Sequence, residues 1–383
     1  MLNGFGIRLL LLLVFTTSLA FAKEKPAAPE KPLTLAFYHP WYGVPWGPAK
    51  TWWKWDSFRF PKRYSPELIR DGRRDLASVD YPLIGAYDNS DPEIARWHFR
   101  LAKAAGIDGF LCSWWKGDGE WYQFQSDLFE NVLLPIAQEE NFKIAVIDEF
   151  AHYNKNFDQL VQRATNHLPR LASHTAYLKI EGQPVWYIYQ VWDDWLSAEQ
   201  AAQYVATVEK EVGDVFWIFD KLKVIATEQW PGAIMTVQSN WLAIPQIDCF
   251  GTYSYLGHWR DQRPKAISAL YSGFAEDVRK AGKKVQLPVL PGHDNTPVHE
   301  APFIFPRENG KTLKTFFTAA HKAKADILVI CSWNEWLEGT TVEPSSDWKD
   351  PYLYLKIIAE QRDKKWKLPP LPQKGSRDPS LTN

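Results

Sequence analysis

Short apolar runs alternate with longer amphipathic stretches along most of this chain. The runs are rich in β-branched and aromatic residues and have the length of single strands, a pattern typical of strands buried inside a parallel sheet. We expect eight such strands, at 33–38, 109–114, 143–149, 184–189, 215–220, 249–255, 285–290 and 327–332.

The stretches between these strands have apolar residues at helical spacing. Several start close to an Asp or Ser and end at a Gly or Asn, which are common residues at helix ends. Helices are therefore predicted at 91–105, 127–140, 157–170, 198–212, 265–281, 312–325 and 353–361. The interval 220–248 is less regular, because 224–226 and 234–238 have strand character and Pro231 and Gly232 interrupt a continuous helix.

Eight strands interleaved with helices predict an α/β fold of the (β/α)8 TIM-barrel type, with one catalytic domain at 33–363. A doubly wound open sheet is the alternative. It is disfavoured because Tyr38-His39-Pro40-Trp41-Tyr42-Gly43, and not a glycine-rich phosphate loop, follows the first strand. In a barrel, the reacting groups are expected where strands end on the C-terminal face.

Both ends of the chain differ from this body. Residues 1–22 have the form of a signal peptide, with Arg8 before an apolar run and Ala20-Phe21-Ala22 as a cleavage pattern. An uncleaved anchor is the alternative, although the run is shorter than the ~20 residues of a membrane span. We expect a secreted or periplasmic protein without a membrane span in the mature chain, a linker at 23–32 and a disordered tail at 364–383.

Composition narrows the choice of partner. The 44 Lys and Arg against 45 Asp and Glu leave a formal charge of −1, so we expect no nucleic acid as ligand. The 20 Trp, 16 Tyr and 21 Phe add some support for sugar binding, since aromatic rings stack on sugar faces. The three cysteines are widely spaced in apolar runs and are expected to be buried free thiols; no metal or other cofactor is predicted, and we expect a monomer.

A pair of glutamates follows the last predicted strand. Glu335 and Glu338 are three residues apart, so a helical turn places them on one side, and Trp333 and Trp336 flank the first of them. Two carboxyl groups of this kind can cleave a glycosidic bond, one by protonating the leaving oxygen and the other by assisting at the sugar. The alternative is a pair of solvated loop acids.

The chain contains several separated motifs in a definite order. They are Phe37-Tyr38-His39-Pro40-Trp41-Tyr42, the stretch 82–88, the stretch 105–109 followed by Ser113-Trp114-Trp115, Pro291-Gly292-His293-Asp294, the stretch 307–310, and the stretch 332–340 with Glu343-Pro344. This ordered set resembles glycoside hydrolase family 99, the endo-α-mannosidases and their bacterial relatives, including polysaccharide-locus proteins labelled glycosyltransferases. The resemblance covers about 35–344.

The resemblance implies a retaining, metal-independent barrel hydrolase that acts inside α-mannose chains of an oligosaccharide or polysaccharide. It places the catalytic pair at Glu335 and Glu338. The first is implied to help the 2-hydroxyl of the sugar attack the anomeric carbon, giving a 1,2-anhydro intermediate. The second is implied to protonate the leaving oxygen and then to activate water.

The remaining candidates are expected to bind substrate. Glu149 ends the third predicted strand and matches a family glutamate, although Ile147-Asp148 before it and Phe150-Ala151-His152 after it depart from the family pattern. Core packing or a loop role is the alternative for most of the set, and Arg307 could instead hold the catalytic loop. The other candidates are Tyr38, Trp41, Trp115, Tyr253, Tyr255, His293, Asp294, Arg307, Asn334 and Trp336.

Two other functions remain open from the sequence. A noncatalytic carbohydrate-binding or polysaccharide assembly protein could keep the same barrel, since a fold does not fix a function. Glycosyl transfer is the second, but the chain has no evident nucleotide-sugar phosphate site.

Overall fold

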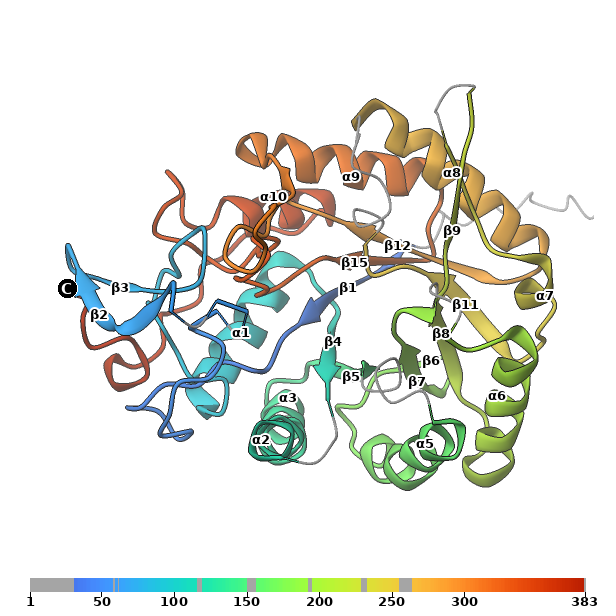
Figure 1. The fold of residues 1–383 in the computed structure, drawn as a ribbon, viewed down its shortest axis with the longest axis horizontal. Coiled ribbons are helices and arrows are strands. Elements are labelled where there is room, and N and C mark those ends of the chain that lie inside the picture. Colours follow the sequence, from blue (N-terminus) through green and yellow to red (C-terminus); the bar gives the residue numbers. More distant parts are fainter. Residues whose placement is uncertain are drawn as a thin grey trace, which may run out of the picture. The chain divides into compact units, whose positions relative to one another are not determined.

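Eight parallel strands close into a barrel in the part of the chain that the structure describes (Figure 1). This computed structural model describes residues 31–381 except 58, 61, 116–118, 150–155, 192–194, 229–232 and 255–263. The predicted signal peptide at 1–22 lies outside the described residues. The strands, in their order around the barrel, are β1 (Leu33–Tyr38), β4 (Gly109–Trp114), β5 (Lys143–Asp148), β7 (Gln183–Ile188), β8 (Phe216–Asp220), β11 (Ile247–Gly251), β12 (Lys284–Val289) and β15 (Ile327–Ile330). The predicted TIM-barrel class is thus confirmed.

The first and last strands pair directly, with Leu35 opposite Val329, and β1 pairs on its other side with β4. Pairing of β5 with β7 completes the ring. Because all eight strands are parallel, their C-terminal ends open onto one face of the barrel.

Helices cover the outside of the barrel, as Figure 1 shows. Their apolar faces pack on the strands, and local capping fixes several ends: Asp91 caps the first helix, and Gly106 ends it with φ 79°. The predicted helix at 127–140 is part of a longer helical run with a π-helical turn in the middle. The helices are α1 (Pro92–Ala105), α2 (Glu120–Leu128), η1 (Phe129–Leu133), α3 (Leu134–Glu139), α5 (Phe157–Ala172), α6 (Ala198–Val212), α7 (Ser239–Leu242), α8 (Pro264–Lys280), η4 (Glu308–Gly310), α9 (Lys311–Lys322), α10 (Leu353–Gln361) and η5 (Lys374–Ser376).

Short antiparallel strands decorate the barrel. The irregular interval before β11 contains the hairpin of β9 (Lys223–Ala226) and β10 (Ala233–Thr236), which agrees with the strand character of 224–226 and 234–238. Three other strand pairs were not predicted. They involve β2 (Ser65–Arg70) with β3 (Arg73–Asp75), β13 (His293–Asp294) with β14 (Ile304–Phe305), and β6 (Lys179–Ile180) with β7.

One predicted strand is wrong at its end. The prediction extended it to 255, but β11 ends at Gly251, and Tyr253 lies in the following loop. A shift in the pairing with β8 occurs between Ile247 and Cys249. The apolar and aromatic residues that suggested a longer strand continue past its last pairing because they belong to the barrel mouth.

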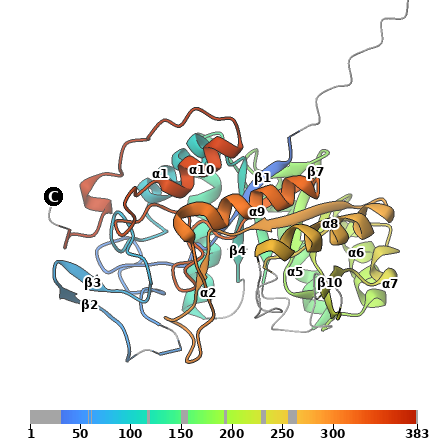
Figure 2. The same cartoon turned by 90° about the horizontal axis from the view of Figure 1, so that it is seen from above.

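The segment after α10 is packed against the barrel, which differs from the disordered tail predicted at 364–383. Asp378 is 3% exposed, accepts a 2.9 Å hydrogen bond from Nε of Arg74, and its own amide donates to the carbonyl of Ile84. The segment therefore lies beside β2 and β3, as both ribbon views show (Figure 2).

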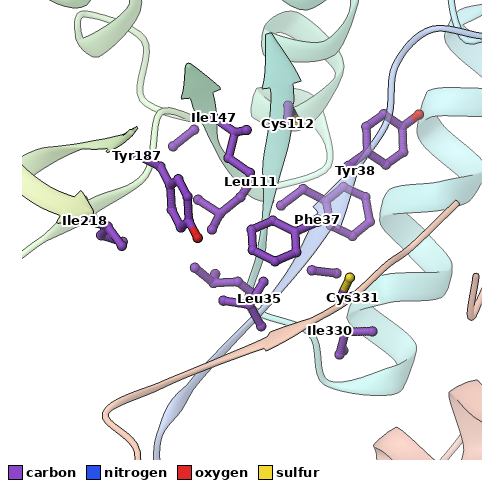
Figure 3. Packing of buried hydrophobic residues seen from close by; sticks show 14 of the residues in the cluster. Leu35, Phe37, Tyr38, Leu111, Cys112, Ile147, Tyr187, Ile218, Ile330 and Cys331 are labelled. Carbon is purple, nitrogen blue, oxygen red and sulfur yellow. The ribbon is translucent and has the colours of Figure 1, made fainter. Parts of the chain in front are cut away.

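The barrel interior is filled by side chains that alternate along the strands. Leu35 and Phe37 of β1 gather with Leu111 and Tyr187, while Tyr38 points the other way (Figure 3). The three cysteines are buried and free, as predicted. Among the described helices, none is long and apolar enough to cross a bilayer.

Candidate active site

Acidic side chains gather where the barrel strands end. The loop after β15 carries Glu335 and Glu338, and Glu149 follows β5. Glu335 is 3% exposed and Glu149 is 6% exposed, whereas Glu338 is half-buried. The predicted catalytic pair is therefore at the C-terminal face, together with the predicted Glu149.

The loop around Glu335 is held by its own hydrogen bonds. The backbone N–H of Glu335 donates to Oγ of Ser332 at 2.8 Å, and Oε1 of Glu335 accepts from the backbone N–H of Leu337 at 3.2 Å. The Ser332 hydroxyl also lies 2.9 Å from that of Thr340, at the other end of the turn. These contacts fix the direction of the Glu335 carboxylate.

Asn334 and Trp336 support this loop from behind. The Asn334 amide accepts from the backbone N–H of His39 at 2.8 Å and donates to the His39 carbonyl at 3.0 Å, so it joins the loops after β1 and β15. Nε1 of Trp336 donates to the hydroxyl of Tyr87 at 3.3 Å. Asn334 is 0% exposed and Trp336 is 1% exposed. Both side chains are enclosed by protein, so the structure shows them supporting the loop, and their predicted substrate contact stays a prediction.

Tyr38 also lies away from the site. Its hydroxyl is 3.1 Å from Nδ1 of His98 on α1, and its ring stacks on Phe110 at 4.9 Å. Side chains alternate along a strand, and Phe37 before it points into the barrel, where it meets Tyr187 (Figure 3). Tyr38, predicted to frame a sugar subsite, therefore points toward α1, and the inward position after Phe37 is His39.

Arg307 holds the loop after β15. Its guanidinium donates to the carbonyl oxygens of Gly339 and Thr341, each at 2.9 Å, and forms an ion pair with Asp80 at 3.1 Å. These contacts match the loop-holding alternative and not the substrate-binding assignment. A planar guanidinium suits this task because it donates in two directions at once.

The pair His293 and Asp294 meets Glu338 from the neighbouring loop. The backbone N–H of Asp294 donates to the Glu338 carbonyl at 2.8 Å, and its carboxylate accepts from both N–H and hydroxyl of Thr296. Asp294 thus closes a turn. His293 is 9% exposed; burial lowers its pKa, and the nearby Glu338 carboxylate opposes that shift. Of this pair, His293 is the residue whose pKa depends on the Glu338 carboxylate.

Aromatic residues border the acids. The ring of Trp41 lies 4.4 Å from that of His39, and the hydroxyl of half-buried Tyr253 lies 3.1 Å from Nε2 of His39. Trp115 donates from Nε1 to Oγ of Ser113 at 3.0 Å. Trp41, Trp115 and Tyr253 are therefore placed near the predicted acids, while Tyr255 lies outside the described residues.

Burial and neighbouring charges raise the pKa values of Glu335 and Glu149. Burial raises the pKa of Glu335 well above its usual value, the charges of Glu338 and Glu149 raise it further, and Lys54 opposes them. Burial likewise raises the pKa of Glu149 to about 8, against a hydrogen bond from Ser113. Glu149 is consequently protonated at neutral pH, and Glu335 and Glu338 cannot easily both be charged.

Lys54 was not predicted from the sequence. Its ammonium lies 4.6 Å from the ring centre of Trp121 and 5.3 Å from that of Trp41. Burial lowers its pKa, while the carboxylates of Glu335 and Glu149 oppose this. The sequence feature that could have identified Lys54 is its place in the run Trp52-Trp53-Lys54-Trp55, since the faces of tryptophan rings attract a cation. Over the described part of the chain, no group of three or more His, Cys, Asp or Glu is arranged to hold a metal ion.

Comparison with known proteins identifies the family. The model described as "Glycosyl hydrolase family 99" matches residues 30–224. The chain belongs to glycoside hydrolase family 99. A second model, described as "Glycosyltransferase WbsX", matches residues 146–356 and overlaps the first. The protein is therefore a glycoside hydrolase by family.

Curated relatives extend this family 99 assignment over most of the chain. A human "Glycoprotein endo-alpha-1,2-mannosidase-like protein" is 25% identical over 85% of this chain and 72% of its own length. A rat "Glycoprotein endo-alpha-1,2-mannosidase" is 24% identical over 86% of this chain and 74% of its own length.

A solved structure shares the fold. The family 99 endo-α-mannosidase from Bacteroides thetaiotaomicron aligns with a TM-score of 0.68 and 22% identity, covering 86% of this chain and 96% of that one. At this identity the match supports the barrel architecture alone.

Proposed function

We propose that this glycoside hydrolase cleaves internal α-mannosidic linkages, or closely related α-glycan linkages, with retention of configuration. The observation that carries the proposal is the buried carboxyl of Glu335 beside Glu338 at the C-terminal face of a family 99 barrel. The relatives named endo-α-1,2-mannosidases support the choice of mannose. The substrate would be an oligosaccharide or polysaccharide.

The first step needs one charged and one protonated carboxyl group. Glu335, as the base, takes the proton of the sugar 2-hydroxyl, and O2 attacks the anomeric carbon to form a 1,2-anhydro sugar. Glu338 gives its proton to the departing glycosidic oxygen at the same time. Burial is the main cause that keeps Glu335 neutral; protonation of Glu338 removes the second, its negative charge, and the Lys54 ammonium favours the carboxylate of Glu335.

The second step reverses these roles. Glu338, now a carboxylate, takes a proton from water, and the water oxygen attacks the anomeric carbon. The ring of the anhydro sugar opens, and Glu335 returns its proton to O2. Two inversions at one carbon give net retention.

Glu149 and Lys54 supply polar contacts of opposite kinds. Protonated Glu149 can donate a hydrogen bond to a sugar oxygen as well as accept one, and its pKa of about 8 keeps this form at neutral pH. The Lys54 ammonium is close enough to favour the charged form of Glu335. Together they favour one negative charge among three acids.

The test is hydrolysis of α-mannan and of a mannose-rich N-glycan, with the anomer of the first product read by NMR. Wild type should release oligosaccharides, with the product first appearing as the α-anomer. Glu335→Gln and Glu338→Gln should each lose at least ~100-fold in rate. Glu211→Gln, on the exposed side of α6, is the matched control and should keep full activity. Equal rates in wild type and both site variants would refute the proposed roles.

Glycosyl transfer is a second candidate, because the overlapping family model is described as a glycosyltransferase. Transfer from a glycan donor would place a sugar hydroxyl where water attacks. Adding a mannoside acceptor to the same assay separates the two: growth of longer products at the expense of hydrolysis would favour transfer.

The proposal includes export through residues 1–22 and action as a monomer. Intact-mass measurement of the protein recovered from the producing cells tests export, since cleavage after Ala22 would leave Lys23 as the first residue. A full-length chain recovered from the cytosol would contradict it. Light scattering at assay concentration tests the monomer.

A further inference from the structure

His39 connects Glu335 to Tyr253. Nδ1 of the imidazole lies 3.5 Å from Oε2 of Glu335, and Nε2 lies 3.1 Å from the Tyr253 hydroxyl. His39 is 3% exposed, and Tyr253 is half-buried. The two ring nitrogens therefore face the carboxyl of Glu335 and the hydroxyl of Tyr253.

The surroundings of His39 hold the ring in this direction. Its backbone N–H and carbonyl both bind the side chain of Asn334, at 2.8 and 3.0 Å. The imidazole packs on Trp41 with a ring-centre distance of 4.4 Å. A ring turned out of its plane would lose this packing, and a half-turn within the plane would take Nε2 away from the Tyr253 hydroxyl.

The imidazole is neutral in this place. Burial lowers the pKa of His39 to about 3, and the positive charge of Lys54, from the same loop, acts in the same direction. Glu335 is influenced from other sides by Glu338 in its own loop and by Glu149 after β5. A neutral imidazole has one donor and one acceptor nitrogen, so its tautomer must match its two partners.

The ionised and the protonated forms of Glu335 require opposite tautomers of the His39 imidazole. When Glu335 is ionised, Oε2 can only accept, so Nδ1 carries the hydrogen and Nε2 accepts from the Tyr253 hydroxyl. When Oε2 is protonated, Nδ1 accepts and Nε2–H donates to the Tyr253 oxygen. The distance of 3.5 Å is longer than a hydrogen bond, as is common for catalytic contacts before substrate tightens them.

We propose that His39 is a proton relay that couples the protonation of Glu335 to the hydroxyl of Tyr253. The inference deepens the proposed function and rests on Glu335 as the base. In one transfer, Glu335 Oε2–H passes its proton to Nδ1, Nε2–H passes its proton to the Tyr253 oxygen, and the Tyr253 O–H passes its proton to a sugar or water oxygen beside it. Each group loses and gains one proton, except that Glu335 becomes a carboxylate and the outer oxygen is protonated. The reverse path restores the start.

The first test needs no substrate. With 15N-labelled histidine, the His39 signals are identified by their loss in His39→Asn, and the shifts of the two nitrogens report the tautomer. We expect His39 to stay neutral down to pH 5 and to change tautomer as Glu335 titrates. The same change should be absent in Glu335→Gln. An imidazolium with an ordinary pKa near 6.5, or one unchanged tautomer across the titration in wild type, would overturn the relay.

The second test is a double-mutant cycle in the glycan assay. His39→Asn keeps an amide near the Nδ1 position but is too short to reach Tyr253, and Tyr253→Phe removes the other end. Each should lower kcat by on the order of 100-fold with a smaller effect on KM, and the double variant should be no slower than the slower single one. Losses that multiply in the double variant would overturn the relay.

Controls keep this result separate from the proposed function. His174→Asn replaces a histidine between α5 and β6, at the opposite end of the barrel, and should leave activity unchanged. If Glu335→Gln keeps wild-type activity, the proposed base is wrong whatever His39 does. If His39→Asn fails to fold, Tyr253→Phe and the wild-type NMR titration still decide the relay.

Discussion

The hydroxyl of Tyr87 donates a 2.7 Å hydrogen bond to Oε2 of Glu343, and neither residue has any exposed surface. The same hydroxyl accepts from Asn334, beside the proposed base. Oε1 of Glu343 lies 3.2 Å from Nε2 of His98 on α1. A buried polar chain thus runs from helix α1, on the outside of the barrel, to the loop that carries the proposed base.

Replacing Tyr87 with Phe should weaken both folding and catalysis. The change removes the donor to buried Glu343 and the acceptor for Asn334, and buried polar groups that lose a partner cost about 1–3 kcal/mol each. The free energy of unfolding, measured by denaturant titration, should fall by that order. The rate should fall with it, because Asn334 positions the loop.

Tyr352→Phe is the matched control for that measurement. Tyr352 is half-buried before α10 and lies outside the polar chain, so its loss should change the stability by less than ~0.5 kcal/mol. Equal stability of Tyr87→Phe and wild type would show that the buried chain contributes little.

Two neighbouring acids should respond in opposite ways to neutralisation. Glu149 has a raised pKa, so the folded state holds a proton that the unfolded state releases, and stability falls as pH rises from roughly 4 to about 8. Glu149→Gln removes this pH dependence. The difference in stability between the variant and wild type should therefore favour the variant more at pH 8 than at pH 5. Asp148→Asn should destabilise it by roughly 3–5 kcal/mol, because Arg163, 2.6 Å away, loses its buried carboxylate.

Thermal unfolding of both variants between pH 5 and pH 8 makes the comparison. If the stability of Glu149→Gln relative to wild type were lower at pH 8 than at pH 5, the buried, protonated state of Glu149 would be contradicted. No loss in Asp148→Asn would mean that the pair with Arg163 contributes nothing to the folded state.

Arg307→Lys should impair catalysis more than binding. Lysine keeps the charge near Asp80 but cannot donate to the carbonyls of Gly339 and Thr341 in two directions. The loop with Glu338 then loses a brace, and we expect kcat to fall about tenfold or more with a smaller change in KM. Arg70→Lys, on the exposed hairpin strand β2, is the control. A rise in KM with unchanged kcat would instead indicate direct substrate binding by Arg307.

Gly339→Ala should be strongly damaging. Gly339 has φ 60°, and a Cβ there would lie 2.9 Å from the carbonyl oxygen of Asp294, so both backbone strain and a steric clash arise at the catalytic loop. Gly273→Ala is a contrasting control, because nothing lies within 4 Å of its added Cβ in α8. That change should stabilise the protein by roughly 0.5–1 kcal/mol. Full activity of Gly339→Ala would contradict the close approach to Asp294.

The alternation of apolar runs and amphipathic stretches along the chain was enough to predict the barrel. Runs such as 33–38 and 109–114 coincide with β1 and β4, because residues buried on both faces of a parallel sheet leave a continuous apolar signal. The strand predicted to 255 ends at Gly251, and the described part of the tail predicted to be disordered packs on the barrel, for a common reason. Pairing register and long-range burial, such as that of Asp378, depend on partners elsewhere in the chain.

The sequence by itself determined which acids stand at strand ends, since Glu149, Glu335 and Glu338 each follow an apolar run. Strand alternation also contained the information that Tyr38 faces outward and His39 inward. Only the tertiary structure decided that Lys54, Tyr87 and Glu343 lie around the loop of Glu335. These contacts join segments that are far apart in the sequence. Burial then raises the pKa of Glu149 and Glu335, since the cost of a charge depends on the folded surroundings and not on its neighbours in sequence.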